Sequence, residues 1–296
     1  MVRNTDTSPD IAARALEALL GDILAEGRKP VEAPDMSDAD GVHELRKAFK
    51  RWRALLRLIA PVIGAEADAL RLEARDLARE MAAARDSQAM REAFADLGEI
   101  ALPPRSRAAI TERLARIEAN AEAASLTPAL KARVGEALAR AAAAIGRWHL
   151  EGLDCEETAR QLAVGYGRAA AAIPQDWPNA SPEALHRFRQ RVVAHRYQME
   201  VAETIWPRLI KLWIAEAQRL RDRLGAHQDL AVLGRLLEPR QPLSAWRSRL
   251  APLIAARQAA HVEAARRLAG RLFAERPKAF RRRLTTLWQH RASREP

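Results

Sequence analysis

The sequence predicts an all-α protein built from two related halves, and three observations support this. Alanine, leucine, arginine and glutamate, all good helix formers, dominate the composition. Only 13 of the 296 residues are glycine and β-branched residues rarely occur in runs, so there is little material for a sheet. Amphipathic segments follow one another between proline and glycine breaks, and a motif recurs about half a chain later.

The first half is predicted to hold six helices separated by breaks. Ser8-Pro9-Asp10 is a helix start signal, because proline suits the first helical position. Pro61 and Gly64 are expected to end the second helix. The predicted helices cover about 8–27, 39–59, 65–86, 88–99, 104–124 and 127–151.

The second half is predicted to hold six more helices. Pro174, Pro178 and Ser181-Pro182 break and restart the chain after the first of them. The predicted helices cover about 153–173, 182–205, 207–226, 228–237, 243–272 and 277–291.

An internal repeat indicates how these helices are organised. The segment VHELR at 42–46 matches LHRFR at 185–189 with an offset of 143 residues, and the same offset places Arg53 on Arg196. Because this offset is about half the chain, we expect two homologous four-helix bundles related by a pseudo-twofold axis. They would form one domain over 8–292, with halves at about 8–151 and 153–292.

The first copy of the motif lies on a strongly amphipathic helix. On a helical wheel of about 100° per residue, residues 42–59 separate into an apolar and a cationic face. The apolar face holds Leu45, Phe49, Trp52, Leu55, Leu56 and Ile59. The cationic face holds His43, Arg46, Lys47, Lys50 and Arg57, with Arg53 at its edge.

The cationic face is expected to lack a compensating acid, because Glu44 is placed elsewhere on the wheel. Like charges three or four residues apart on a helix destabilise it by a few tenths of a kcal/mol each, roughly. A bound polyanion would offset this repulsion. The alternative is that the face is simply solvated, or pairs with acids of another helix.

The second copy of the motif carries a smaller basic set. His186, Arg189 and Arg196 occupy the matching positions, and Tyr197 joins the polar face with a hydroxyl that can donate to an anion. Gln190, Val193 and Ala194 replace the basic residues Lys47, Lys50 and Arg51 of the first copy. We therefore expect the first half to contribute more charge.

The overall charge indicates an anionic partner. Net charge is +11 and 43 of the 49 basic residues are arginine, whose guanidinium matches phosphate oxygens bidentately. Cys155 is the single cysteine, which fits a reducing compartment. The polar start of the chain and the lack of a run of about 18 apolar residues predict a cytoplasmic protein without membrane insertion.

The sequence resembles the CHAD family, the conserved histidine α-helical domain, over about residues 8–292. Three segments carry the resemblance. They are VHELRKAFKRWR at 42–53, LHRFR at 185–189 with Arg196-Tyr197, and LRDRLGAHQDL at 220–230.

This resemblance implies a pair of four-helix bundles with a basic groove between them. It also implies non-catalytic binding of inorganic polyphosphate and an association with polyphosphate granules. By position, the implied binding residues are His43, Arg46, Lys47, Lys50, Arg53, His186, Arg189 and Arg196, to which the wheel adds Arg57 and the second copy adds Tyr197. Val193 and Ala194 depart from the family, which usually has basic residues there.

Alternatives to polyphosphate binding are weaker on the sequence. The two motif histidines lack an acid or cysteine one turn away, so no metal or cofactor is expected. A glycine-rich phosphate loop and a nucleophile elbow are absent, so no catalysis is expected. Nucleic-acid binding is the runner-up, although no aromatic stacking platform is visible, and docking of an acidic protein follows. The sequence leaves the oligomeric state open.

Overall fold

The computed structural model describes residues 9–33, 35–81, 86–98, 102–121 and 126–292, and these ranges contain helices and no strand. None of the helices in these ranges has both the length and the apolar character needed to cross a bilayer. The prediction of an all-α protein is confirmed. The α-helices are α1 (Pro9–Glu32), α2 (Asp38–Ile63), α3 (Ala65–Glu80), α4 (Asp86–Asp96), α5 (Pro104–Ala121), α6 (Pro128–Ile145), α7 (Cys155–Ala170), α8 (Pro182–Gln198), α9 (Pro207–Arg235), α10 (Arg247–Leu272) and α11 (Pro277–Ala292).

Two prolines lie inside helices, although the sequence predicts that the first helix ends near residue 27 and that Pro61 helps to end the second. Pro30 belongs to α1 and Pro61 to α2. Each proline removes one hydrogen bond from the last turn, and its helix ends two residues later. The second helix ends instead at Gly64, whose φ of 84° few other residues adopt.

The predicted break near His227 is also wrong. The chain forms one helix of 29 residues, α9, where two helices were expected. Leu220, Leu224, Leu230 and Leu233 continue the buried face across Gly225. Packing of this continuous apolar face outweighs the roughly 1 kcal/mol that a glycine costs inside a helix.

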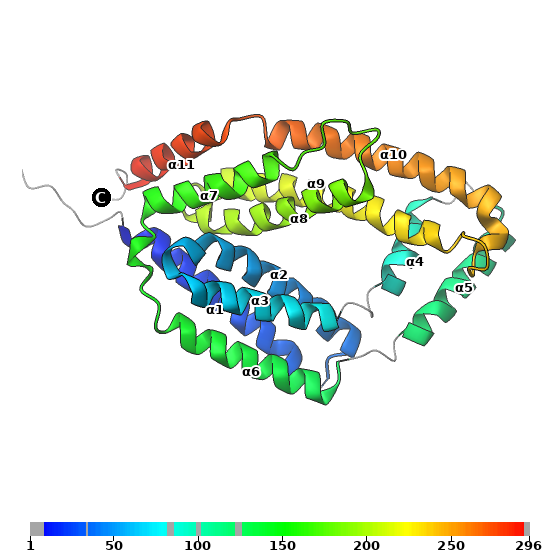
Figure 1. The fold of residues 1–296 in the computed structure, drawn as a ribbon, viewed down its shortest axis with the longest axis horizontal. Coiled ribbons are helices and arrows are strands. Elements are labelled where there is room, and N and C mark those ends of the chain that lie inside the picture. The colour runs from blue at the N-terminus through cyan, green and yellow to red at the C-terminus, as the bar shows by residue number, and fades with distance from the viewer. Residues whose placement is uncertain (1–8, 34, 82–85, 99–101, 122–125, 293–296) are drawn as a thin grey trace, which may run out of the picture.

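Most helices lie in two groups, one above the other in Figure 1, while α4 and α5 lie beside the ends of α9 and α10. Helices α1, α2, α3 and α6 form the lower group, and α7, α8, α9, α10 and α11 form the upper group. Helix α2 packs against α8 where the groups meet, and α4 packs against α9. The predicted pseudo-twofold relation between two bundles remains a prediction.

Two hydrophobic clusters form the core, and neither is confined to one half of the chain. The larger cluster includes Leu16 of α1, Leu55 of α2 and Phe280 of α11. The smaller one joins Phe94 of α4 and Ile110 of α5 to residues of α9 and α10. The smaller cluster therefore packs helices from the first half of the chain against the C-terminal end of α9.

The predicted apolar face of α2 is confirmed. Leu45, Leu55, Leu56 and Ile59 are completely buried, and Trp52 and Phe49 are each 4% exposed. With its apolar face in the core, α2 turns the opposite face toward α8 and α9, where the site lies.

Candidate anion-binding site

Two adjoining pockets lie where α2 faces α8 and α9. The inner pocket has a volume of about 280 Å³ and lies against α4 and the middle of α9. The outer pocket, of about 430 Å³, lies toward the start of α2. Arg46, Lys50 and Arg221 line both, so these three cations stand at the boundary between the pockets.

All ten residues predicted from the sequence line one or both pockets. Arg53, Arg57, His186 and Arg189 line the inner pocket only. The predicted residues that line only the outer pocket are His43, Lys47, Arg196 and Tyr197. The structure therefore brings together two helices whose motifs lie 143 residues apart in sequence.

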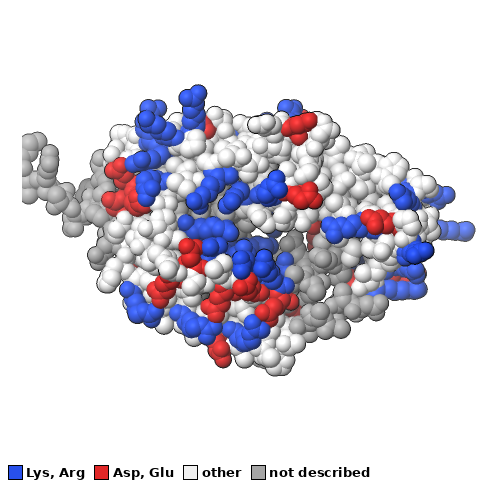
Figure 2. All heavy atoms as spheres, in the orientation of Figure 1, with Lys and Arg blue, Asp and Glu red and all other residues white. Residues whose placement is uncertain are grey.

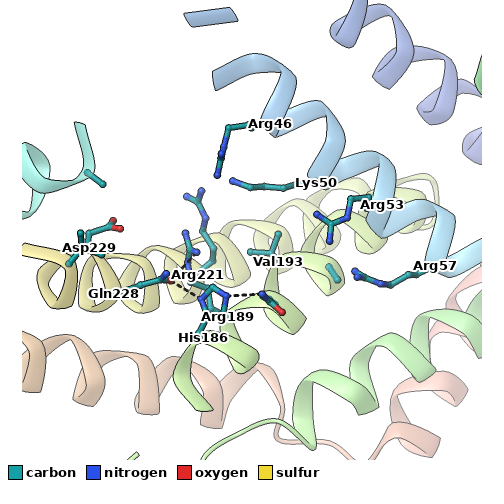
Figure 3. A pocket seen from close by; sticks show the side chains of 14 residues that line it. Arg46, Lys50, Arg53, Arg57, His186, Arg189, Val193, Arg221, Gln228 and Asp229 are labelled. Atoms are coloured by element: carbon teal, nitrogen blue, oxygen red, sulfur yellow. Dashed lines mark hydrogen bonds between the residues drawn. The ribbon is translucent and has the colours of Figure 1, made fainter. Parts of the chain in front are cut away.

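Helix α2 presents its cations as a row. Arg46, Lys50, Arg53 and Arg57 point from successive turns into the space that α8 and α9 face (Figure 3). At 1.5 Å per residue, the helix carries charge from His43 to Arg57 over roughly 21 Å. Arg46 Nη1 also donates to the carbonyl of Met81 over 2.9 Å, which satisfies a carbonyl at the end of α3.

Lys47 is paired with an acid, although the sequence predicts that the cationic face lacks one. Its Nζ lies 3.2 Å from Oε2 of Glu44, one turn earlier on α2. The expectation that Glu44 would leave this face uncompensated is wrong, because a long glutamate side chain reaches a residue three positions on. The pair is exposed, so an incoming anion competes with Glu44 at little cost.

Arg53 and Arg57 face other cations. Burial, followed by repulsion from Arg53, Arg71, Arg191 and Arg168 in that order, lowers the pKa of Arg57 to about 10. Burial also lowers the pKa of Arg53, with help from arginines of α3. Neither side chain forms an ion pair within the described residues. An anion in the inner pocket would offset both the cost of burying these two charges and their repulsion by other cations.

His186 is held between two glutamine side chains. Its Nδ1 lies 3.0 Å from Oε1 of Gln228, and its Nε2 lies 2.7 Å from Nε2 of Gln190. An amide nitrogen only donates, so in this arrangement Nε2 accepts from Gln190 and Nδ1 donates to Gln228. Arg189 shares the Gln228 oxygen at 3.4 Å.

Arg189 lies against α9 at Gly225. A Cβ atom at this position would stand 3.4 Å from both Nε and Nη2 of Arg189, which is ordinary van der Waals contact, so the position does not require glycine. The guanidinium of Arg189 lies there beside the side chain of Gln228.

Arg196 and Tyr197 form the rim of the outer pocket on α8. The Arg196 guanidinium lies 3.8 Å from the centre of the Tyr197 ring, and its Nη1 lies 3.8 Å from Oε1 of Glu200. Glu200 also holds Arg51, at 2.6 Å. Arg196 is thus partly neutralised, in contrast to Arg53 and Arg57.

Helix α9 supplies lining residues that were not predicted. Arg221 lines both pockets, Gln218 the outer one, and Gln228 and Asp229 the inner one. The signal was available in LRDRLGAHQDL at 220–230. Arg221 was missed because its place opposite α2 depends on how α9 packs in the fold.

Positive charge dominates the described lining of both pockets. The inner pocket has six arginine or lysine residues and one carboxylate, Asp229, and the described lining of the outer pocket has five and none. Figure 2 shows lysine and arginine side chains gathered on both sides of a hollow in the middle of one face. The arrangement can hold an extended anion by ion pairs and donated hydrogen bonds.

Comparison with known proteins identifies the family. The chain matches the CHAD domain over residues 14–238, about three quarters of its length. The chain belongs to the CHAD domain family. The match spans both copies of the motif and the segment of α9 that lines the pockets.

The CHAD fold is also found in a solved structure. The crystal structure of the CHAD domain from the plant Ricinus communis superposes with a TM-score of 0.57 at 21% identity, covering 87% of this chain and 91% of that one. This similarity shows a shared CHAD fold. No curated protein matches this CHAD chain in sequence.

Proposed function

We propose that this CHAD protein binds inorganic polyphosphate, without catalysis, in a basic groove formed by the two adjoining pockets. One observation carries the proposal. Cations from α2, α8 and α9 line a continuous path that contains a single described carboxylate. The association with polyphosphate granules that the family resemblance implies would follow from such binding.

A linear anion fits this path better than a compact one. The cations of α2 recur every one to two turns from His43 to Arg57, and Arg189 and Arg221 face them from α8 and α9. Each phosphate unit of polyphosphate carries negative charge, so successive phosphates can pair with successive cations of α2. Release of counterions would drive binding and make it strongly dependent on salt.

The lining offers little to the bases of a nucleic acid. Tyr197 is the one phenyl ring among the described lining residues, and the Arg196 guanidinium covers its face at 3.8 Å. Trp52 is 4% exposed and belongs to the core. Single-stranded nucleic acids depend on stacking platforms for much of their affinity, and none is present here.

A competition experiment tests the proposal. The full chain is loaded with labelled single-stranded DNA at moderate salt, and polyphosphate of defined length is titrated against it. Polyphosphate is expected to displace DNA at a phosphate concentration at least about tenfold lower than unlabelled DNA does. Equal displacement would mean a general polyanion surface, and the absence of displacement would reject the proposal.

A further inference from the structure

Three acidic residues outside the lining of the outer pocket each pair with a cation of that lining. The pairs are Lys47 with Glu44 at 3.2 Å, Arg221 with Asp222 at 2.6 Å, and Arg196 with Glu200 at 3.8 Å. The acids belong to α2, to α9 and to the 3-10 helix η3 (Met199–Thr204) that follows α8. Three of the five lysine and arginine residues described in this lining therefore have an acidic partner.

Glu44 and Asp222 are the more exposed members of this group. Oδ1 of Asp222 accepts from Nη1 of Arg221 at 2.6 Å and from Nε2 of Gln218, another residue of the lining, at 2.8 Å. The side chain of Asp222 is 51% exposed and that of Glu44 is 41% exposed. Exposed ion pairs are weak and are screened by salt, so an incoming anion can displace either acid with a modest loss of affinity.

The inner pocket has cations of a different kind. Arg53 and Arg57 line this pocket only, and neither forms an ion pair within the described residues. The Nε of Arg53 is buried and has no hydrogen-bond partner among these residues. An anion in the inner pocket therefore meets two cations from which it need not displace an acid, whereas in the outer pocket it competes with acids for three of the five.

A carboxylate beside a cation weakens phosphate binding in two ways. It occupies donors that would otherwise bind phosphate oxygens, and its charge repels the phosphate. A short chain can occupy the inner pocket alone. A long chain continues past Arg46, Lys50 and Arg221 into the outer pocket, where it meets the acids.

We infer that Glu44 and Asp222 are specificity-determining residues that limit the affinity of the groove according to the length of the bound chain. Lys47 lines only the outer pocket, so Glu44 acts on chains that are long enough to enter that pocket. Arg221 lines both pockets, so Asp222 acts on short and long chains alike. The inference rests on the proposed function, because it concerns how the same groove distinguishes polyphosphate chains.

The test uses Glu44→Gln and Asp222→Asn, each of which removes a charge and keeps the size of the side chain. The matched controls are Glu136→Gln of α6 and Glu112→Gln of α5. Both control acids are exposed, pair with an arginine four residues along the same helix and lie outside both pockets. The affinity of the full chain is measured for tripolyphosphate and for polyphosphate of many tens of phosphates, from low to high salt.

At low salt, Glu44→Gln is expected to bind the long chain at least about twofold more tightly than Glu136→Gln does, with equal affinities for tripolyphosphate. Asp222→Asn is expected to bind both ligands at least about twofold more tightly than Glu112→Gln does. Each gain should come with a steeper slope of log affinity against log salt. A cation that loses its acid takes up a counterion from solution, and the bound anion then releases it.

A purely structural role for these acids predicts weaker binding in both variants, not a gain. Variants that bind the long chain no more tightly than their controls would overturn the inference and leave the proposed function intact. An equal gain for tripolyphosphate and the long chain in Glu44→Gln would overturn the separate roles of the two pockets. If the parent protein binds neither ligand, the proposed function fails and the inference fails with it.

Discussion

The indole Nε1 of Trp213 donates a hydrogen bond to Nε2 of His195 over 3.0 Å in the core. His195 is completely buried, and the rings of Tyr166, Phe273 and Phe280 surround it. Burial lowers the pKa of His195 to about 3. The imidazole is therefore a neutral acceptor and is separate from the anion site.

Stability is expected to fall in mild acid because of this histidine. An unfolded histidine takes up a proton below about pH 6.5, whereas folded His195 stays neutral until about pH 3. Within that window, each unit of decreasing pH lowers the free energy of unfolding by up to about 1.4 kcal/mol. His227, whose pKa burial also lowers, acts in the same direction.

Urea unfolding of the parent and of His195→Gln at several pH values measures this effect. Glutamine does not titrate, and its amide oxygen can accept from Trp213. The variant should be less stable near pH 8 but should lose less stability on acidification. A parallel pH profile for the two proteins would contradict the assignment.

Arg51 is expected to stabilise the fold without contributing to anion binding. It lies between Lys50 and the buried Trp52, yet its Nε lies 2.6 Å from Glu200 and its Nη1 3.1 Å from Glu26. Removing one partner of a half-buried ion pair leaves the other charges uncompensated. Arg51→Met should lower the free energy of unfolding by about 2–4 kcal/mol.

The same variant should keep its affinity for polyphosphate within about twofold, measured below its unfolding temperature. Lys50→Met is the adjacent comparison, because Lys50 lines both pockets. Loss of binding in Arg51→Met without loss of stability would show that this arginine contacts the anion.

Replacing Arg46, Lys47 and Lys50 together with alanine should remove most polyphosphate affinity. We expect at least about a tenfold loss and a smaller salt slope, since three charge contacts disappear. The matched control is Arg208, Lys211 and Lys278 to alanine, three exposed cations without described ion pairs. Fluorescence titration measures the affinities, and circular dichroism verifies that both variants remain helical.

A modest loss of stability in the Arg46 variant is expected, because its bond to the Met81 carbonyl is lost. It should be about 1 kcal/mol, the usual contribution of one hydrogen bond. Equal binding by the site variant and the control would show that the pockets are not the site.

Asp96, the last residue of α4, binds two side chains of α10. Its Oδ1 accepts from Arg257 Nη2 at 2.7 Å, and its Oδ2 accepts from Arg257 Nε at 3.0 Å and lies 2.7 Å from Nε2 of the buried His261. The hydrogen bonds from Arg257 and His261 hold the pKa of Asp96 at about 2. This stabilisation is complete above about pH 4 and lost as pH falls through 2.

Asp96→Asn should therefore lower the free energy of unfolding at neutral pH by about 1–3 kcal/mol. Relative to the parent protein, hydrogen exchange should increase most in α4, because Asp96 links this helix to α10. Glu112→Gln is the control, because Glu112 belongs to an exposed pair within α5. Equal destabilisation of the two variants would show that Asp96 has no special role.

Much of the lining of the candidate site could be predicted from sequence because periodicity determines which way side chains face. The six apolar residues of the α2 wheel are buried, and the ten predicted site residues line the two pockets. Glycine and proline were less informative about where helices end. Pro30, Pro61 and Gly225 all lie inside helices, because tertiary packing can outweigh a local preference.

Pairing between distant segments could not be predicted. Whether Arg51 or Arg53 is neutralised depends on Glu26 and Glu200, which the fold places beside one and not the other. Arg221 and Gln228 were missed for a similar reason. Their role depends on where α9 crosses α2 and α8, and one helix alone does not encode that crossing.

The smaller hydrophobic cluster joins the two halves of the chain. Phe94 and Ile110 come from the first repeat, and Leu230 and Leu250 from the second. A fragment ending near residue 151 would leave Phe94 and Ile110 facing water, and the complementary fragment would expose the leucines. If the chain arose by duplication of a shorter ancestor, that ancestor needed a second copy of itself to cover these side chains.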